Sequence, residues 1–230
     1  MPAEAFRDTL PPHERHFVGR FESFADIVVG FSMSLLALQL TVPHNASDVF
    51  GHPMRYVFFF ASFALVSVFW IGFHRIVATG FAPQRIDMVL ALAYLAFVAL
   101  TPYAMLANLT LSTSSADAYA GLGLYVAVFG GVSACSLLLS VRGARRGWPY
   151  LDETRRRALW RRLVMNAMVL ACLAVALSFA VQRNVAAAGA SMFAIFPAMA
   201  IVRRFFTEPR PAWLGIADPA AGTSRPQAVS

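Results

Sequence analysis

Residues 24–42 read FADIVVGFSMSLLALQLTV, an apolar stretch that holds a single acidic residue, Asp26, close to its start. A helix needs about 20 mostly apolar residues to cross the hydrocarbon core of a bilayer, so this stretch is predicted to span a membrane. Five further apolar segments follow, at about 54–77, 86–110, 118–141, 159–181 and 185–202. We therefore predict an all-α integral membrane protein with six transmembrane helices.

The composition of the 230-residue chain supports this class: 58% of the residues are hydrophobic and only 13% are charged. A soluble domain usually carries about twice that share of charge, and a disordered chain has few apolar residues and much charge. Six spans leave no room for a soluble catalytic domain. We expect residues 1–205 to form the transmembrane domain and residues 206–230, rich in Pro, Ala, Gly and Ser, to be a disordered tail.

The basic residues indicate the orientation of the chain. All 19 are Arg, and all but Arg55 and Arg183 lie on one side of the six predicted spans, with a dense group at 142–162. Cytoplasmic loops carry the excess of positive charge, so both termini are predicted to be cytoplasmic. The net charge of +7 could also indicate nucleic-acid binding. We expect no nucleic-acid partner, because the arginines alternate with apolar runs and suit the anionic inner leaflet of a lipid bilayer.

Several kinds of chemistry lack their motifs. Cys135 and Cys172 both lie inside apolar stretches and are predicted to be small core residues. The sequence has no HExxH, CxxC or phosphate-binding loop, and it lacks the TVGYG filter of ordinary potassium channels. We therefore expect no catalytic residues, no metal site and no cofactor, and we do not expect an enzyme.

Ionisable residues inside a membrane span are expensive to bury and indicate function. Asp26 lies near the start of the first span and His74 near the end of the second. Because the two spans run in opposite directions, these residues lie at similar depth, and a hydrogen bond between the two helices is plausible. Trp70 lies one turn before His74 on the same face and can pack beside the pair. The alternative is that Trp70 and His74 only anchor the helix end at the membrane interface.

The first span also has a regular stripe. Ile27, Phe31, Ser34, Leu38 and Thr41 follow one another at steps of four and three residues, which places them on one helix face. Such a stripe is most often a packing face whose hydroxyls bond back to their own helix. The functional alternative is a pore lining with a hydrophobic constriction and one ring of hydroxyl groups.

Three short motifs resemble one known family. Residues 20–26 (RFESFAD) resemble the Arg-x-x-x-Phe-Ser-Asp signature that opens the first helix of the transmembrane protein 175 family, which comprises endolysosomal potassium channels and their bacterial relatives. Trp70 and His74 look like the family's Trp/His pair, and Pro102-Tyr103 is similar to its Pro-aromatic step. The matching motifs lie within residues 20–103.

The resemblance implies a potassium-selective cation channel in a bacterial inner membrane, built as a homotetramer with one six-helix repeat per chain. The first helices line the pore without a carbonyl filter, and potassium is the permeant ion. Carried over by position from Asp26, the apolar constriction falls on Phe31, the hydroxyl layer on Ser34 and a further lining position on Leu38, with Ile27 in the same stripe. The motif residues that would hold the first span against the second are Arg20, Phe24, Asp26, Trp70 and His74.

The chain departs from the family pattern at three places. Ala25 replaces the signature Ser, Phe31 stands where Ile is common, and Ala91 lies in a stretch where the family often has Asn. Four Phe rings would close a narrow pore more firmly than four Ile side chains. The departures motivate an alternative to the channel, namely a non-conducting membrane scaffold or small-molecule transporter that retains the fold.

Overall fold

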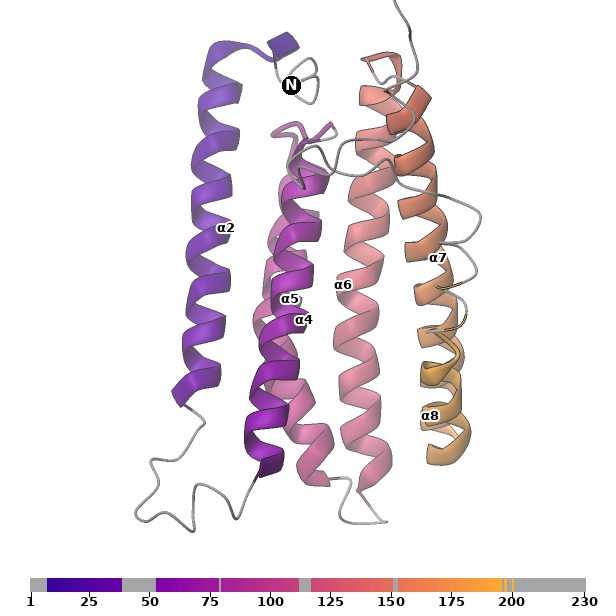
Figure 1. The fold of residues 1–230 in the computed structure, drawn as a ribbon. Coiled ribbons are helices and arrows are strands. Elements are labelled where there is room, and N and C mark those ends of the chain that lie inside the picture. The colour runs from indigo at the N-terminus through magenta and orange to yellow at the C-terminus, as the bar shows by residue number, and fades with distance from the viewer. Residues whose placement is uncertain are drawn as a thin grey trace, which may run out of the picture.

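The computed structural model of the chain describes residues 8–38, 53–78, 80–111, 117–150, 153–195, 197 and 200. The elements lie in the order α2 (Pro12–Leu38), α4 (Pro53–Ala78), α5 (Arg85–Leu111), α6 (Ala118–Gly147), the short 3-10 helix η1 (Trp148–Tyr150), α7 (Glu153–Val181) and α8 (Val185–Phe193). Figure 1 shows these helices as one bundle of roughly antiparallel rods.

The predicted all-α membrane protein is confirmed. Five of the described helices, α2, α4, α5, α6 and α7, are long and apolar enough to cross a membrane. The sixth predicted segment, 185–202, begins with the nine-residue helix α8, and its last residues lie outside the described part of the chain. The tail predicted at 206–230 also lies outside the described residues.

Three helices are longer than the apolar segments from which they were predicted. Helix α2 begins at Pro12 rather than near residue 24, α6 continues to Gly147 rather than to residue 141, and α7 begins at Glu153 rather than at residue 159. A helix satisfies its own backbone hydrogen bonds in water as well as in lipid, and Arg is a good helix former. Proline suits the first helical position because the N–H group that it lacks would have no hydrogen-bond acceptor within the helix. Hydropathy therefore located the spans but not the ends of the helices.

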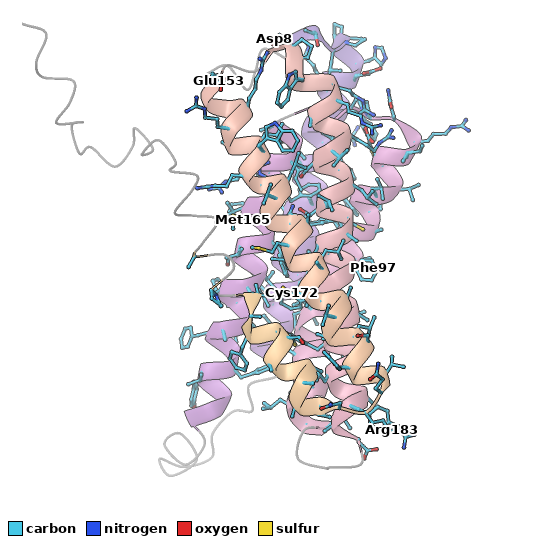
Figure 2. The ribbon with its side chains drawn as sticks, turned by 90° about the vertical axis from the view of Figure 1, so that its right-hand side faces the viewer. Asp8, Phe97, Glu153, Met165, Cys172 and Arg183 are labelled. Carbon is cyan, nitrogen blue, oxygen red and sulfur yellow. The ribbon has the colours of Figure 1, made fainter. Side chains whose placement is uncertain are left out.

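The extensions lie at one end of the bundle, which we call the arginine-rich end: α2, α5 and α7 begin there, and α4 and α6 end there (Figure 1). Helix α2 lies at one side and contacts α4 and α5, whereas α6 contacts α4, α5 and α7, and α8 packs on α7. Asp8 and Glu153 lie at the arginine-rich end and Arg183 at the opposite end (Figure 2). The described arginines are thus segregated along the bundle as the sequence predicts.

The core consists of two apolar clusters. One joins α2, α4, α5 and α6 around Phe73 and Tyr94, and the other joins α6, α7 and α8 around Leu173 and Ala176. Since lipid is as apolar as these side chains, close packing rather than water exclusion holds membrane helices together. One close contact is at Gly131, where an added Cβ would lie 2.7 Å from the ring of Phe97.

Candidate functional site

The polar site lies between α2 and α4. Trp70 donates its indole N–H to Asp26 Oδ1 over 2.8 Å, and His74 Nε2 lies 3.0 Å from the same oxygen. The rings of Trp70 and His74 meet edge to face with their centroids 4.8 Å apart. The two donors lie four residues apart on one face of α4. The hydrogen bond between the two helices that the sequence made plausible is therefore formed.

This site lies on the surface of the single chain rather than in its core. The Asp26 side chain is 49% exposed and that of His74 is 32% exposed. A carboxylate at this position in a membrane span is costly if it faces lipid. The open side of Asp26 therefore needs water or another protein chain beside it.

A buried layer behind the site keeps this face of α4 in place. Tyr94 of α5 donates its hydroxyl to the carbonyl oxygen of Phe69 over 2.7 Å, and its ring stacks on Phe73 with centroids 5.5 Å apart. Phe69 and Phe73 directly precede Trp70 and His74 in the chain. Tyr94 was not predicted from the sequence, although a buried tyrosine hydroxyl within an apolar span usually has a hydrogen-bond partner nearby.

The remaining motif residues occupy different surroundings. Ala25 is fully buried, so a serine at this position would need an acceptor inside the core. Phe24 is half-exposed and stacks on Phe21 of its own helix. Arg20 is exposed, and no hydrogen bond or ion pair joins its side chain to another residue in the described part of the chain. Of the five residues predicted to hold the first two spans together, the structure brings together Asp26, Trp70 and His74.

The predicted stripe of α2 faces away from the rest of the bundle. Ile27, Phe31 and Leu38 are exposed, with Phe31 at 68%, and Ser34 is exposed as well. The opposite face of the helix is buried and includes Val18, Phe21, Ala25, Val29, Ser32 and Leu36. The packing face of α2 is thus a different one from the stripe. The fifth residue of the stripe, Thr41, lies outside the described residues.

The hydroxyl oxygen of Ser34 keeps lone pairs that can accept a hydrogen bond or contact a cation. Its hydroxyl donates to the carbonyl oxygen of Gly30 over 2.9 Å, which occupies its proton and leaves oxygen lone pairs available. Gly30 has open space where a side chain would be. The exposed face of α2 therefore combines large apolar side chains with a hydroxyl oxygen that can contact a cation.

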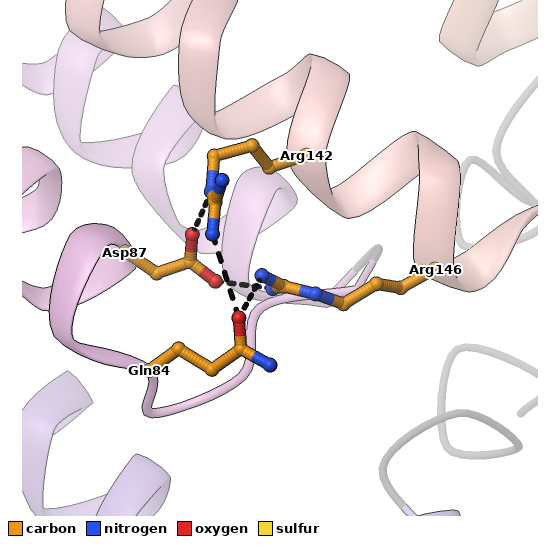
Figure 3. A network of polar contacts seen from close by, with 4 residues as sticks. All are labelled: Gln84, Asp87, Arg142 and Arg146. Carbon is orange, nitrogen blue, oxygen red and sulfur yellow. Dashed lines mark hydrogen bonds and ion pairs between the residues drawn. The ribbon is translucent and has the colours of Figure 1, made fainter.

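A second polar network, which sequence analysis missed, lies at the arginine-rich end between α5 and α6 (Figure 3). The carboxylate of Asp87, only 1% exposed, accepts from Nε of Arg142 with one oxygen and from Nη1 of Arg146 with the other. The amide oxygen of Gln84 accepts from Nη2 of Arg146 over 2.6 Å and from Nη2 of Arg142 over 3.4 Å.

In the sequence, Arg142 and Arg146 indicated only the orientation of the chain. Their four-residue spacing places them on one face of α6 and was the available signal; Gln84 directly precedes α5, three positions before Asp87. Among the described residues, no group of three or more His, Cys, Asp or Glu side chains could hold a metal ion. The two polar networks described above thus each join a pair of helices.

The fold places the chain in a class of membrane proteins that includes a solved channel. It matches the crystal structure of a homologue of the lysosomal potassium-selective channel TMEM175 from Chamaesiphon minutus, with a TM-score of 0.60 and 20% sequence identity. The match covers 84% of this chain and 99% of the other. At that identity the likeness concerns the fold.

The sequence comparison is more specific. Residues 20–102 match the family model described as the endosomal/lysosomal potassium channel TMEM175, which confirms the resemblance drawn from the motifs. The matched residues contain α4, most of α2 and the greater part of α5, and with them Asp26, Trp70, His74 and the exposed stripe. No curated protein matches the chain.

Proposed function

We propose that the chain is a potassium-preferring cation channel that assembles as a homotetramer around α2. One observation carries the proposal: Ile27, Phe31, Ser34 and Leu38 form the face of α2 that its own bundle leaves uncovered. Four copies related by a central axis would turn these faces toward one another. The Phe31 rings would then form a hydrophobic constriction, and the Ser34 hydroxyls would form a polar ring beyond it.

The environment of Asp26 supports assembly of this kind. A partly exposed Asp–His pair between two membrane-spanning helices is expensive against lipid. A neighbouring copy or a water-filled vestibule beside α2 would remove that cost. The matches to the TMEM175 family model and to a structure described as a potassium-selective channel homologue point to the same function. No cofactor is needed for such conduction, since potassium is the permeant ion.

We also propose a location in a bacterial inner membrane with both termini in the cytoplasm. The support is the position of the arginines: those of the described helix ends gather where α2 begins, and Arg183 lies at the opposite end (Figure 2). The arginine-rich end would then face the cytoplasm.

Ion flux across the membrane of liposomes tests the channel. Purified protein reconstituted in potassium-loaded vesicles is expected to support a flux that does not need valinomycin. Phe31→Ala is expected to increase this flux several-fold, because it removes the bulky apolar side chains at the narrowest part of the proposed pore. Phe60→Ala is the matched control, since Phe60 on α4 is exposed to the same degree, 65% against 68%. Absence of flux above empty vesicles for both wild type and Phe31→Ala would overturn the channel.

Phe31 also favours the second candidate function, a non-conducting scaffold or small-molecule transporter, because four large rings can seal a narrow pore. Oligomeric state separates the two. A tetramer on native mass spectrometry in detergent supports the channel. A monomer would exclude it, since a single copy of α2 cannot enclose an ion path.

A further inference from the structure

The connection between α4 and α5 touches the bundle on two sides at the arginine-rich end. On one side Gly80 packs against the carbonyl group of Gly143 in α6, so closely that an added Cβ would overlap with it. Gly80 has a φ of +142°, a conformation that other residues rarely adopt. A glycine at position 80 therefore allows the connection to pack directly against the backbone of α6 at Gly143.

The buried carboxylate of Asp87 holds the same segment on α6. Arg142 and Arg146 lie one turn apart on either side of Gly143 and bind separate oxygens of Asp87 (Figure 3). A buried carboxylate requires neutralising and hydrogen-bonding partners in a defined place. The Gln84 amide, three residues earlier, binds the same two guanidinium groups. The start of α5 is therefore held in one position along α6.

On its other side the connection touches α2. The ring of Phe81, which is buried, stacks on that of Phe21 with centroids 5.7 Å apart and planes 4° apart. Phe21 lies on the buried face of α2, one turn before Ala25 and Asp26, and it also contacts Phe73 of α4 with centroids 6.1 Å apart. The short connection thus forms a bridge from α6 to the helix that carries the exposed stripe.

We propose that Asp87 is a positioning residue for the pore helix. Its ion pair with Arg142 and Arg146 holds residues 80–84 against α6, and the stack of Phe81 on Phe21 carries that position to the arginine-rich end of α2. The stripe of α2 then meets its counterparts in other copies at a defined angle and height. The effect on conduction rests on the proposed function, but the effect on the position of α2 does not.

A distance measurement tests the position directly. Spin labels are placed at His16→Cys on α2 and Leu138→Cys on α6, both exposed positions, in a chain that also carries Cys135→Ala and Cys172→Ala. Labelled chains are mixed with excess unlabelled chains so that only distances within one chain are recorded. Asp87→Asn is expected to shift or broaden the distance distribution. Glu153→Gln is the matched control, because Glu153 pairs with Arg157 at the surface and should leave the distribution unchanged.

A second variant keeps the test decisive. Phe81→Leu removes the ring stack but leaves the ion pair in place, and it is expected to change the distance in the same way. The double variant should show no larger change than the stronger single one, because both lie on one path. An unchanged distance in a folded Asp87→Asn protein, or in Phe81→Leu where Asp87→Asn does not fold, would overturn the inference.

Flux measurements separate this inference from the proposed channel. If wild type conducts, both variants are expected to change the ratio of potassium to sodium flux at least twofold, whereas Glu153→Gln should not. A conducting wild type with unchanged flux ratios in both folded variants overturns the effect of Asp87 on conduction and leaves the channel. Shifted distances without any wild-type flux overturn the channel and leave the positioning role.

Discussion

Asp26 engages both donors of α4 with a single carboxylate oxygen, and this contact sets the height at which α2 meets α4. The contact of Phe21 with Phe73 between the same two helices is apolar and tolerates small shifts along the helix axis. The hydrogen bonds do not tolerate such shifts, since their geometry is narrow. At the scale of the residue, the hydrogen bonds of Asp26 therefore fix the height of α2 on α4, and the ring stack of Phe81 on Phe21 holds the end of α2 beside the connection between α4 and α5.

Removal of the Asp26 carboxylate should therefore impair assembly more than it alters ion preference. Asp26→Ala leaves Trp70 and His74 without their acceptor, and an unsatisfied donor costs about 1–3 kcal/mol. We expect a reduced yield of the oligomer on size exclusion. Ser23→Ala is the control, because Ser23 is exposed on the same helix and its hydroxyl donates to the carbonyl oxygen of Gly19 one turn earlier. A normal oligomer yield together with a changed potassium-to-sodium ratio would contradict this expectation.

Helices α5 and α6 pack closely because α6 has glycine where it faces α5, as at Gly121 and Gly131. An added Cβ on Gly121 would lie 3.0 Å from the Cα of Asn108, whereas at Gly123 it would meet open space. Gly121 and Gly123 lie two residues apart in α6, yet of these two only Gly121 faces α5. Helix α7 is joined to α6 differently, through the amide of Asn166, which donates to the hydroxyl of Ser136 over 2.9 Å.

The two glycines form a matched pair for a stability measurement. Gly121→Ala pushes a methyl group against the backbone of α5, and overpacking of this kind costs about 1–3 kcal/mol. Gly123→Ala meets no neighbour and gains helix propensity, about 1 kcal/mol at most. Thermal unfolding in detergent should show a lower Tm for Gly121→Ala than for wild type, with Gly123→Ala equal or higher. Equal melting of the two variants would mean that α5 and α6 are farther apart than described.

At the scale of the whole molecule, the bundle is polarised along its long axis. The long extensions of α2, α6 and α7 lie at the arginine-rich end, where the Asp87 network is also found. The opposite end carries Arg183, which leads into α8 and lies over the ring of Tyr119. One end of the protein is therefore suited to an anionic leaflet, and the other end is not.

Cysteine labelling in intact cells tests the proposed orientation, in which the arginine-rich end faces the cytoplasm. In a chain with Cys135→Ala and Cys172→Ala, Arg183→Cys should react with a membrane-impermeant maleimide added outside the inner membrane. Arg145→Cys, exposed at the arginine-rich end, should react only after the cells are opened. Labelling of Arg145→Cys in intact cells, with Arg183→Cys protected, would reverse the orientation.

Much of this protein could be predicted from local properties of the chain. Hydropathy located the spans, and their alternating direction placed Asp26 and His74 at one depth, so that the contact between α2 and α4 was predictable. Periodicity placed Ile27, Phe31, Ser34 and Leu38 on one face. These inferences need only the helix repeat and the thickness of a bilayer.

Tertiary structure decided whatever depends on how each helix is rotated and which neighbours it has. It selected Arg142 and Arg146 as the partners of Asp87 from a dense group of arginines, and it placed Gly121 against α5 but left Gly123 open. It also left the stripe of α2 uncovered. The physical reason is that a helical repeat defines faces but not what covers them, because coverage depends on side chains distant in sequence that meet only in the packed bundle.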